Sequence, residues 1–382
     1  MFDFSVLPQH LQESLKVFMK NNVQTPIIIC SKDQIATNLS FFLQQLKLKR
    51  SDIYFPVKVN HAPAILNYFN DAGTNFEIAS VGELFILEKL KIPAGRIMFS
   101  NPVKIPDHIK CAYKYGVQYF AFDTETELQK IALNAPQSSV YARISISNTG
   151  AQWTLNQKFG IPENKVVGLM KRAIEFNLKP VGIAFHVGWN NKNTNTYKEA
   201  IQRAADIFHE LKQNGISLEF MNIGGGFPAH DGDPYPLLQK IASEINPDLE
   251  FLKKQFGIRI IAEPGSFLTA DTSALICSVA DVIKRKNKSW IFLDSGINQG
   301  FQWILSGIRY QVIYPYKTSA DTTLKKFIIT GPTCDSHDVF SKDIALPEHV
   351  KTGDKMLVFP AGAYINSAER YNGFEYPDTF FS

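Results

Sequence analysis

The sequence is poor in the features that mark secreted, membrane-bound or disulfide-linked proteins. Its 382 residues include only four cysteines, which stand far apart and form no C-x-x-C pair. They indicate reduced thiols in a cytoplasmic protein instead of a disulfide framework. No run of 18 apolar residues is present, and the opening segment MFDFSVLPQHLQESL lacks the basic and apolar regions of a signal peptide. We therefore expect neither a membrane span nor a secretory leader.

The sequence also lacks a marked charge excess and a metal-binding histidine pattern. Lys and Arg number 40 against 36 Asp and Glu, which gives a net charge of +4, and no five basic residues are consecutive. This balance argues against a nucleic-acid surface. The eight histidines show no H-x-H or H-x-x-x-H spacing. We therefore expect no dedicated metal site.

Residues 35–265 show a regular alternation of short apolar runs and longer segments with helical spacing. Eight alternating strand–helix units predict a closed parallel (β/α)8 barrel of the TIM type, with an open doubly wound sheet as the structural alternative. The eight runs predicted as strands are residues 52–59, 75–79, 96–100, 117–123, 139–146, 180–188, 218–225 and 257–263.

After this region the pattern changes to strands separated by turns, with little helix, as in SWIFLDSG, KKFIITGPTCD and DKMLVFPAGAY. Residues 266–382 are therefore predicted to form an all-β domain, a β-sandwich or β-barrel. The apolar segment TPIIICS, residues 25–31, precedes the barrel pattern. We expect it to complete that domain, which then comprises residues 1–34 and 266–382.

Four features stand at the ends of predicted barrel strands: Lys58, His186, the glycine turn 224–226 and Glu263. Each alone has an ordinary explanation, such as a solvated charge, a buried histidine, a tight turn or a salt bridge. In a barrel of this type, however, the carboxyl ends of the strands form the active site. Together they fit pyridoxal phosphate: a lysine for the aldehyde, amides for the phosphate, a carboxylate for the ring nitrogen and an imidazole for the ring face.

Ten motifs carry a resemblance to a known family. In chain order they are FPVKVN, FEIASVGEL, MFSNPVK, FDTETEL, KFGI, FHVGWN, NIGGGFP, AEPG, GPTCDSHD and GAYINSAERYNGF. They resemble the barrel-type (fold type III) pyridoxal phosphate decarboxylases, the ornithine and diaminopimelate decarboxylase family. The ornithine decarboxylase-like branch is the most similar, through GPTCDSHD and YNGF.

The resemblance implies roles for residues at matching positions. Lys58 would carry the cofactor as an internal aldimine, with His186 against the ring and Glu263 on its nitrogen. Cys334 would protonate the quinonoid carbon in the other subunit's site, and Asp335 would bind the distal part of the substrate. A homodimer with shared active sites follows as an expectation. The remaining cofactor contacts implied are Gly225, Gly226, Gly265, Ser266 and Tyr364.

Departures from the family pattern bear on the substrate. Ser266 stands where the family has a phosphate-binding arginine, and Gly307 stands where the branch has an acidic residue. Trp189, Arg370 and Phe374 are expected to contact substrate together with Asp335. A buried ammonium that lacks a counter-charge is costly. These departures favour a modified or conjugated diamino acid, such as a siderophore or antibiotic precursor.

Three alternatives stay open at this point. The first is an ornithine or lysine decarboxylase of polyamine synthesis. The second is an amino-acid racemase, against which GPTCD argues. The third is a non-catalytic, decarboxylase-like binding protein, against which the retained Lys58, His186, Glu263 and Cys334 argue. Pro56 is unusual inside a strand, because proline removes a ladder donor. On a period of two, Tyr54, Pro56 and Lys58 should share one face.

Overall fold

The structure is a computed structural model, and it describes residues 7–21, 24–230, 232–316, 323–366 and 371–381, together with Asp3 and Ser5. The chain separates into two compact units. The barrel unit comprises residues 39–267, and the β unit comprises residues 1–38 and 268–382. Within the described ranges, no helix is both long and apolar enough to cross a membrane.

Eight parallel strands form the sheet of the barrel unit, and each pairs with the next one in the chain. They are β2 (Tyr54–Pro56), β3 (Asn75–Ile78), β4 (Ile97–Phe99), β5 (Tyr119–Phe122), β6 (Ser139–Arg143), β7 (Lys179–Ala184), β8 (Phe220–Asn222) and β9 (Arg259–Ile261). The first and last strands are joined too, because the Tyr54 amide donates to the Ala262 carbonyl at 2.9 Å and the Ala262 amide donates to the Asp52 carbonyl at 3.0 Å. The predicted closed barrel is confirmed, and the open sheet is wrong.

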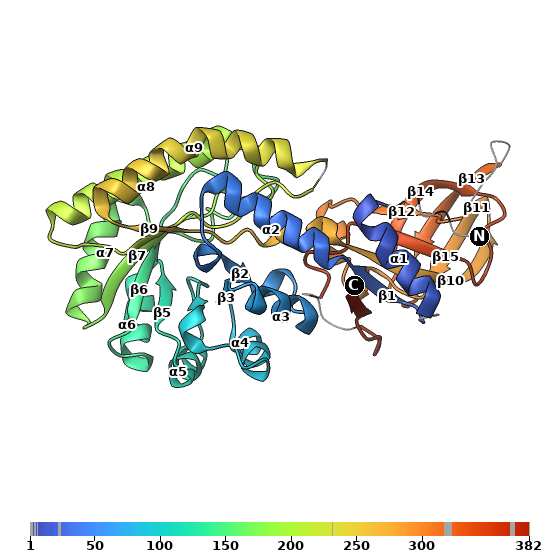
Figure 1. The fold of residues 1–382 in the computed structure, drawn as a ribbon. Helices are drawn as coiled ribbons and strands as arrows, with labels where there is room; N and C mark the ends of the chain where they lie inside the picture. Colours follow the sequence, from blue (N-terminus) through green and yellow to red (C-terminus); the bar gives the residue numbers. More distant parts are fainter. Residues whose placement is uncertain are drawn as a thin grey trace. The chain divides into compact units, whose positions relative to one another are not determined.

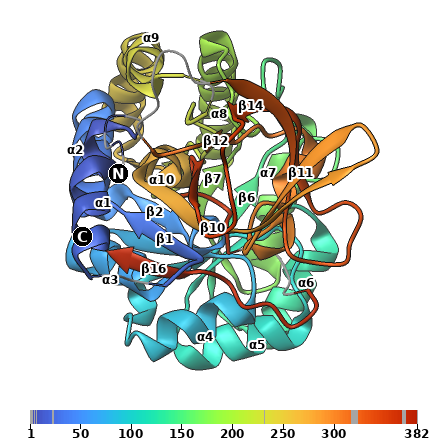
Figure 2. The ribbon, with the colours of Figure 1, turned by 90° about the vertical axis from the view of Figure 1, so that its right-hand side faces the viewer.

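Helices follow the barrel strands and surround the sheet (Figure 1; Figure 2). They are α3 (Pro63–Asp71), α4 (Val81–Lys89), α5 (Pro106–Tyr115), α6 (Glu125–Asn134), α7 (Glu163–Glu175), α8 (Thr194–Gln213) and α9 (Pro234–Phe256), while α2 (Lys32–Leu46) precedes the first strand. Helix α8 shows why these segments are helical. Its side chains Ile201, Ala204, Phe208 and Leu211 are buried along one face, and the Asn193 side chain caps its first turn by accepting the Asn195 amide.

The strand that leads to Lys58 is shorter than predicted. It ends at Pro56, and residues 57–59 form a 3₁₀ turn that carries Lys58. The expected common face of Tyr54, Pro56 and Lys58 is therefore wrong, because a period of two holds only within a strand. Tyr54 packs in the barrel interior, whereas the Lys58 side chain extends from the turn to the Glu77 carboxylate.

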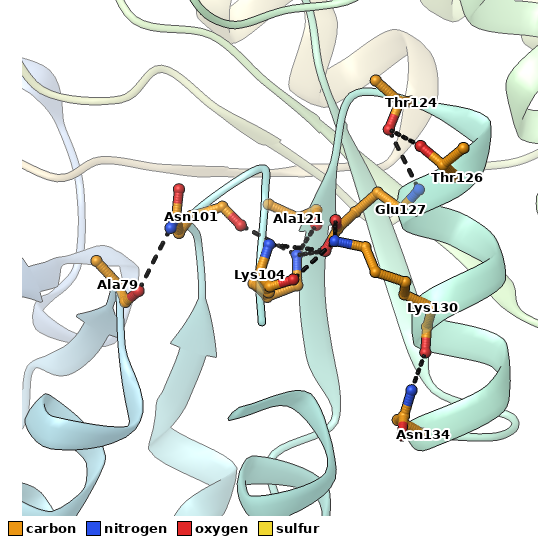
Figure 3. A network of polar contacts seen from close by, with 9 residues as sticks. All are labelled: Ala79, Asn101, Lys104, Ala121, Thr124, Thr126, Glu127, Lys130 and Asn134. Atoms are coloured by element: carbon orange, nitrogen blue, oxygen red, sulfur yellow. Dashed lines mark hydrogen bonds and ion pairs between the residues drawn. The ribbon is translucent and has the colours of Figure 1, made fainter. Parts of the chain in front are cut away.

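A buried ion pair anchors the loop after β4 to the start of α6 (Figure 3). The Lys104 Nζ lies 2.9 Å from the Glu127 Oε1, and both side chains are fully buried. The ammonium also donates to the carbonyls of Asn101 and Ala121. The second oxygen of Glu127 pairs with Lys130. The loop after β4, strand β5 and helix α6 therefore meet at one charge network, whose central ion pair is buried.

The β unit contains the remaining strands and one further helix, α1 (Gln9–Asn21). A continuous path of strands runs in the order β12-β15-β10-β11-β13-β14, and β1 pairs with both β10 and β16. Their bounds are β1 (Ile27–Cys30), β10 (Ser273–Arg285), β11 (Lys288–Leu293), β12 (Gln311–Ile313), β13 (Leu324–Thr330), β14 (Val339–Pro347), β15 (Lys355–Phe359) and β16 (Asp378–Phe381).

The expected role of the segment 25–31 is confirmed, because β1 pairs antiparallel with β10 and parallel with β16. Strand β10 shifts register between Val279 and Asp281, which passes it from one half of the sheet to the other. Side chains of both halves then pack in one core, which includes Ile28, Leu275, Ile291, Phe327 and Met356. Helix α1 and the strands β14 and β16 were not predicted from the sequence pattern.

Candidate active site

The amine of Lys58 is held by a carboxylate from the neighbouring strand. Its Nζ donates to both oxygens of Glu77, on β3, at 3.0 and 3.1 Å. The Lys58 side chain is 44% exposed, whereas the Glu77 side chain is only 3% exposed. The buried carboxylate therefore orients an amine that remains accessible to a ligand.

Glu263, which follows β9, is a second buried carboxylate. It accepts a hydrogen bond from the Asn222 side-chain amide at 2.6 Å. Burial raises the pKa of Glu263 to about 7, and the nearby charge of Glu77 acts in the same direction. The positive charges of Lys58 and Arg143 oppose this rise. Glu263 can therefore exchange a proton near neutral pH, which an ordinary glutamate cannot do.

The imidazole of His186 is fixed in one tautomer. Its Nδ1 accepts the Gly188 amide proton at 3.0 Å, which leaves the proton of the neutral ring on Nε2. Burial lowers the pKa of His186 well below its ordinary value, and the charges of Arg143 and Lys58 lower it further. The ring is therefore neutral at pH 7 and suited to stack on an aromatic ligand.

The glycine turn after β8 offers two unpaired amides. The Gly224 amide donates to the Asn222 side chain at 2.8 Å, but those of Gly225 and Gly226 form no hydrogen bond within the described chain. A methyl group at Gly225 would lie 2.5 Å from the Glu263 carbonyl oxygen, and one at Gly226 would lie 2.0 Å from the Gly188 carbonyl oxygen. Only glycine fits there, and its exposed amides suit an anion.

Three further predicted residues belong to the barrel unit. A methyl group at Gly265 would lie 2.6 Å from the Val59 side chain, so its backbone packs against the turn of Lys58. Ser266 is half-buried in the first turn of the short helix α10 (Gly265–Thr269). Trp189 is buried and stacks on Trp153 at a centroid distance of 4.6 Å. Its role as a substrate contact stays a prediction.

The other predicted residues belong to the β unit, and their role toward the Lys58 cluster stays a prediction. The exposed Cys334 thiol donates to the Asn372 side chain at 3.4 Å. Asp335 accepts the His337 amide at 2.9 Å, and this hydrogen bond lowers the pKa of the Asp335 carboxyl.

Tyr364 adopts a φ of 61°, and its ring centroid lies 5.6 Å from that of Trp303. Phe374 is partly exposed. Gly307 ends a 3₁₀ turn, residues 302–306, with a φ of 90°. Arg370 and its neighbour Glu369 lie outside the described residues.

Three residues of this cluster were missed in the sequence: Glu77, Arg143 and Asn222. Arg143 ends β6, and its charge is close enough to affect the pKa values of Glu263 and His186. The signal was available for the first two, because NFEIA and SVYARISI each place one charge inside an otherwise mostly apolar run, as FPVKV does. Asn222 had no such signal, because a polar residue before a glycine turn is common.

The cluster has the donors and acceptors that pyridoxal phosphate needs. The segments that follow β2, β7, β8 and β9 carry an accessible amine, a neutral imidazole, two free amides and a carboxylate that can hold a shared proton. These four strands belong to one barrel. The glycine turn has no room for a side chain. In the described ranges, no group of three or more His, Cys, Asp or Glu residues could hold a metal ion.

Comparisons with known proteins agree with this cofactor. The family model described as pyridoxal-dependent decarboxylase, pyridoxal binding domain, matches residues 32–270. The lysine/ornithine decarboxylase of Selenomonas ruminantium is 34% identical over 366 residues, which cover 95% of this chain and 91% of the relative. The ornithine decarboxylase of Mus musculus is 31% identical over 351 residues, 87% of this chain and 76% of the relative.

A solved structure shows the same similarity in three dimensions. The crystal structure of SrLDC in complex with PLP and cadaverine has a TM-score of 0.85 at 31% identity, and the match covers 98% of this chain and 94% of that chain. These relatives are named for the decarboxylation of free diamino acids. They give no support to the expected modified or conjugated substrate, and they favour the first of the three alternatives.

Proposed function

The chain belongs to the pyridoxal phosphate-dependent amino-acid decarboxylases, and we propose that it acts on a free basic amino acid of the lysine and ornithine class. The observation that carries this substrate class is Asp335. Its carboxyl is ionised at neutral pH, as an ordinary aspartate is, and the His337 amide that donates to it lowers its pKa further. An ionised carboxylate is the natural partner of a distal ammonium.

The residues of the barrel unit divide the work of holding the cofactor. Bound pyridoxal phosphate supplies the electron sink for loss of CO₂ from an amino acid. Lys58 would bind its aldehyde carbon, and the amides of Gly225 and Gly226 would bind its phosphate. Glu263, with a pKa near 7, would hold the proton at the ring nitrogen. His186, neutral and fixed by Gly188, would cover one face of the ring.

The residues of the β unit would act on the substrate. In the proposed enzyme, a second copy of the chain supplies Asp335 for the distal ammonium and the Cys334 thiol to return a proton to the α-carbon. Gly307 is no obstacle to a free diamino acid, because a methyl group there would meet nothing within 4 Å. Open space admits water, which can solvate an ammonium where a second carboxylate is lacking. The expected particle is a homodimer of the 43.0 kDa chain.

Release of CO₂ from a substrate panel tests this proposal. The panel contains lysine, ornithine and arginine, together with lysine and ornithine acetylated on the side-chain nitrogen. Acetylation removes the distal charge, so we expect kcat/KM for the better free diamino acid to exceed that of its acetylated form by ~10⁴-fold, as for a site built to pair a polar group of its substrate.

The control is Lys58→Ala, which removes the amine without changing Asp335. We expect this variant to release no CO₂ above background from any substrate. A preference for either acetylated form would refute the proposed substrate class. Activity of Lys58→Ala at the wild-type rate would instead show that Lys58 does not hold the cofactor.

A further inference from the structure

Asp338 is a fully buried carboxylate at the end of the loop between β13 and β14. Its Oδ1 accepts the Ile297 amide at 2.7 Å. Its Oδ2 accepts the Thr333 hydroxyl at 2.6 Å and the Thr333 amide at 3.2 Å. Within the described part of the chain, no Lys, Arg or His forms an ion pair with it. Asp338 is therefore a buried carboxyl group whose two oxygens are held by donors from two separate turns.

The surrounding backbone is shaped to this carboxylate. A methyl group at Gly296 would lie 2.2 Å from the Asp338 Oδ1, and one at Gly331 would lie 2.4 Å from the same atom. Both glycines therefore leave the space that the carboxylate fills. A longer side chain, such as glutamate, has no room at this position.

The main chain of Asp338 closes the same loop. Its carbonyl accepts the Gly331 amide at 3.0 Å, and its amide donates to the Asp335 carbonyl at 3.1 Å. The backbone of Asp338, the last residue of the segment 331–338, is thus bonded to the first residue, Gly331, and to Asp335. Cys334 and Asp335 lie in the middle of the segment. Asp338 is buried, whereas Cys334 is exposed and Asp335 is partly exposed, so the anchor lies inside and the reactive groups lie outside.

The bond to Ile297 brings in a second turn. Residues 297–299 form a 3₁₀ turn, and the next residue after the bonded amide is Asn298. The Asn298 side-chain amide lies 3.5 Å from the Asp335 Oδ2 and 3.5 Å from the Thr333 hydroxyl. Asp338 therefore holds both turns together, and it sets the polar surroundings of the Asp335 carboxylate without touching it.

We propose that Asp338 is a positioning residue that fixes the segment 331–338 so that Cys334 and Asp335 are held in the pose that meets the substrate. This inference rests on the proposed function, in which Asp335 binds the distal ammonium. Thr333 is part of the same device, because its hydroxyl and amide both donate to one carboxylate oxygen.

Asp338→Asn is the first test, made in the holoenzyme. Both carboxylate oxygens of Asp338 accept hydrogen bonds, but an asparagine side chain has only one acceptor oxygen. Either Ile297 or Thr333 therefore loses its acceptor in the variant. The control is Asp343→Asn, an exposed carboxylate on β14 that pairs with Lys326. Thr333→Val removes the hydroxyl that donates to Asp338, and Thr333→Ser keeps it. These two milder variants replace Asp338→Asn as the test if that variant does not fold.

The readout is inhibition by cadaverine compared with n-pentylamine, which lacks the second ammonium. Misplacing Asp335 should raise the inhibition constant of cadaverine by ~10-fold and that of n-pentylamine by less than ~2-fold. Thr333→Val should show the same pattern more weakly, and Thr333→Ser and Asp343→Asn should match the wild type. A merely structural role lowers the active fraction and leaves both constants unchanged, which would overturn the proposal, as would an equal rise in both.

A second readout separates this inference from the proposed function. The alkylation rate of Cys334 by iodoacetamide, mapped by peptide mass spectrometry, reports the pose of the loop directly. We expect Asp338→Asn to change it by at least ~5-fold and Asp343→Asn to leave it unchanged. If the wild type binds cadaverine no better than n-pentylamine, the role of Asp335 fails. In that case the alkylation rates alone test the positioning role of Asp338. Equal rates in Asp338→Asn and the wild type would overturn it.

Discussion

The buried ion pair of Lys104 and Glu127 gives a stability prediction whose size follows from the structure (Figure 3). The perturbation is Glu127→Gln, which keeps the shape and removes the charge. Burial lowers the pKa of Lys104 to about 8 even though Glu127 raises it. Without the carboxylate, burial is almost unopposed, and the folded variant holds Lys104 neutral at pH 6 to 8.

The loss of stability in Glu127→Gln is limited, because Lys104 can release its proton and become neutral. In the wild type, folded Lys104 keeps its proton below about pH 8. The variant must give that proton up on folding, which costs ~1.4 kcal/mol for each pH unit below 8. That makes ~1 kcal/mol at pH 7 and ~3 kcal/mol at pH 6. Loss of the Lys130 pair and of hydrogen-bond geometry adds ~1 kcal/mol at every pH.

The sign of the pH dependence follows from the same proton. The unfolded chain is protonated at this lysine in both proteins, so the variant takes up one more proton on unfolding than the wild type does. Its stability therefore rises with pH relative to the wild type, and the deficit shrinks from ~4 kcal/mol at pH 6 to ~1 kcal/mol above pH 8.

Urea unfolding followed by tryptophan fluorescence measures the deficit at pH 6, 7, 8 and 9. The matched control is Glu125→Gln, two residues earlier, which removes the exposed partner of Arg172. Exposed ion pairs contribute little, so this control should follow the wild type at every pH. A deficit for Glu127→Gln that does not change between pH 6 and pH 8 would refute the reasoning, because it would show that Lys104 carries no titrating charge.

Two further predictions concern Glu83 and the glycine turn. Burial raises the pKa of Glu83 to about 7, so the wild type loses up to ~3 kcal/mol of stability from this group between pH 5 and 8. Glu83→Gln, which can still accept the Ala79 amide, should remove that loss. Urea titrations at pH 5 and pH 8 measure the stability of the variant relative to the wild type, and an equal difference at the two pH values would contradict the prediction. Gly226→Ala should weaken pyridoxal phosphate binding by ~10-fold or more, whereas Gly73→Ala, with a similar φ of 78° but open space, should not. Equal affinities in absorbance titrations of the two apo variants would count against the anion site.

The barrel could be predicted because its parallel strands are buried on both faces and stand out as apolar runs. The β unit was harder to read. Strand β14, residues 339–347, exposes the consecutive charged residues Lys342 and Asp343 between half-buried neighbours, and these charges hide it. Strand β16 is a short edge strand whose residues are mostly half-buried. Strand β16 is held by pairing with β1, which is far away in the sequence, and such pairing leaves little local signal.

The site was predicted unevenly for a related reason. Lys58, His186 and Glu263 were identified because they lie where apolar runs end, and one charge in such a run is conspicuous. Glu77 and Arg143 carry the same signal but lie inside predicted strands, where a charge reads as a surface position. Only the closed barrel shows that Glu77 faces the Lys58 amine and not the solvent.

The overestimated strand lengths have the same physical origin as the site itself. The loops at the carboxyl ends of the strands are buried: Val57, Val59, Phe185 and Val187 are each at most 1% exposed. An apolar pattern therefore continues past the last ladder hydrogen bond, and the sequence cannot show where pairing stops. Buried loops also have few rotameric alternatives. They can hold Lys58 and His186 in fixed positions, as a cofactor site requires, so the error in strand length and the precision of the site come from the same packing.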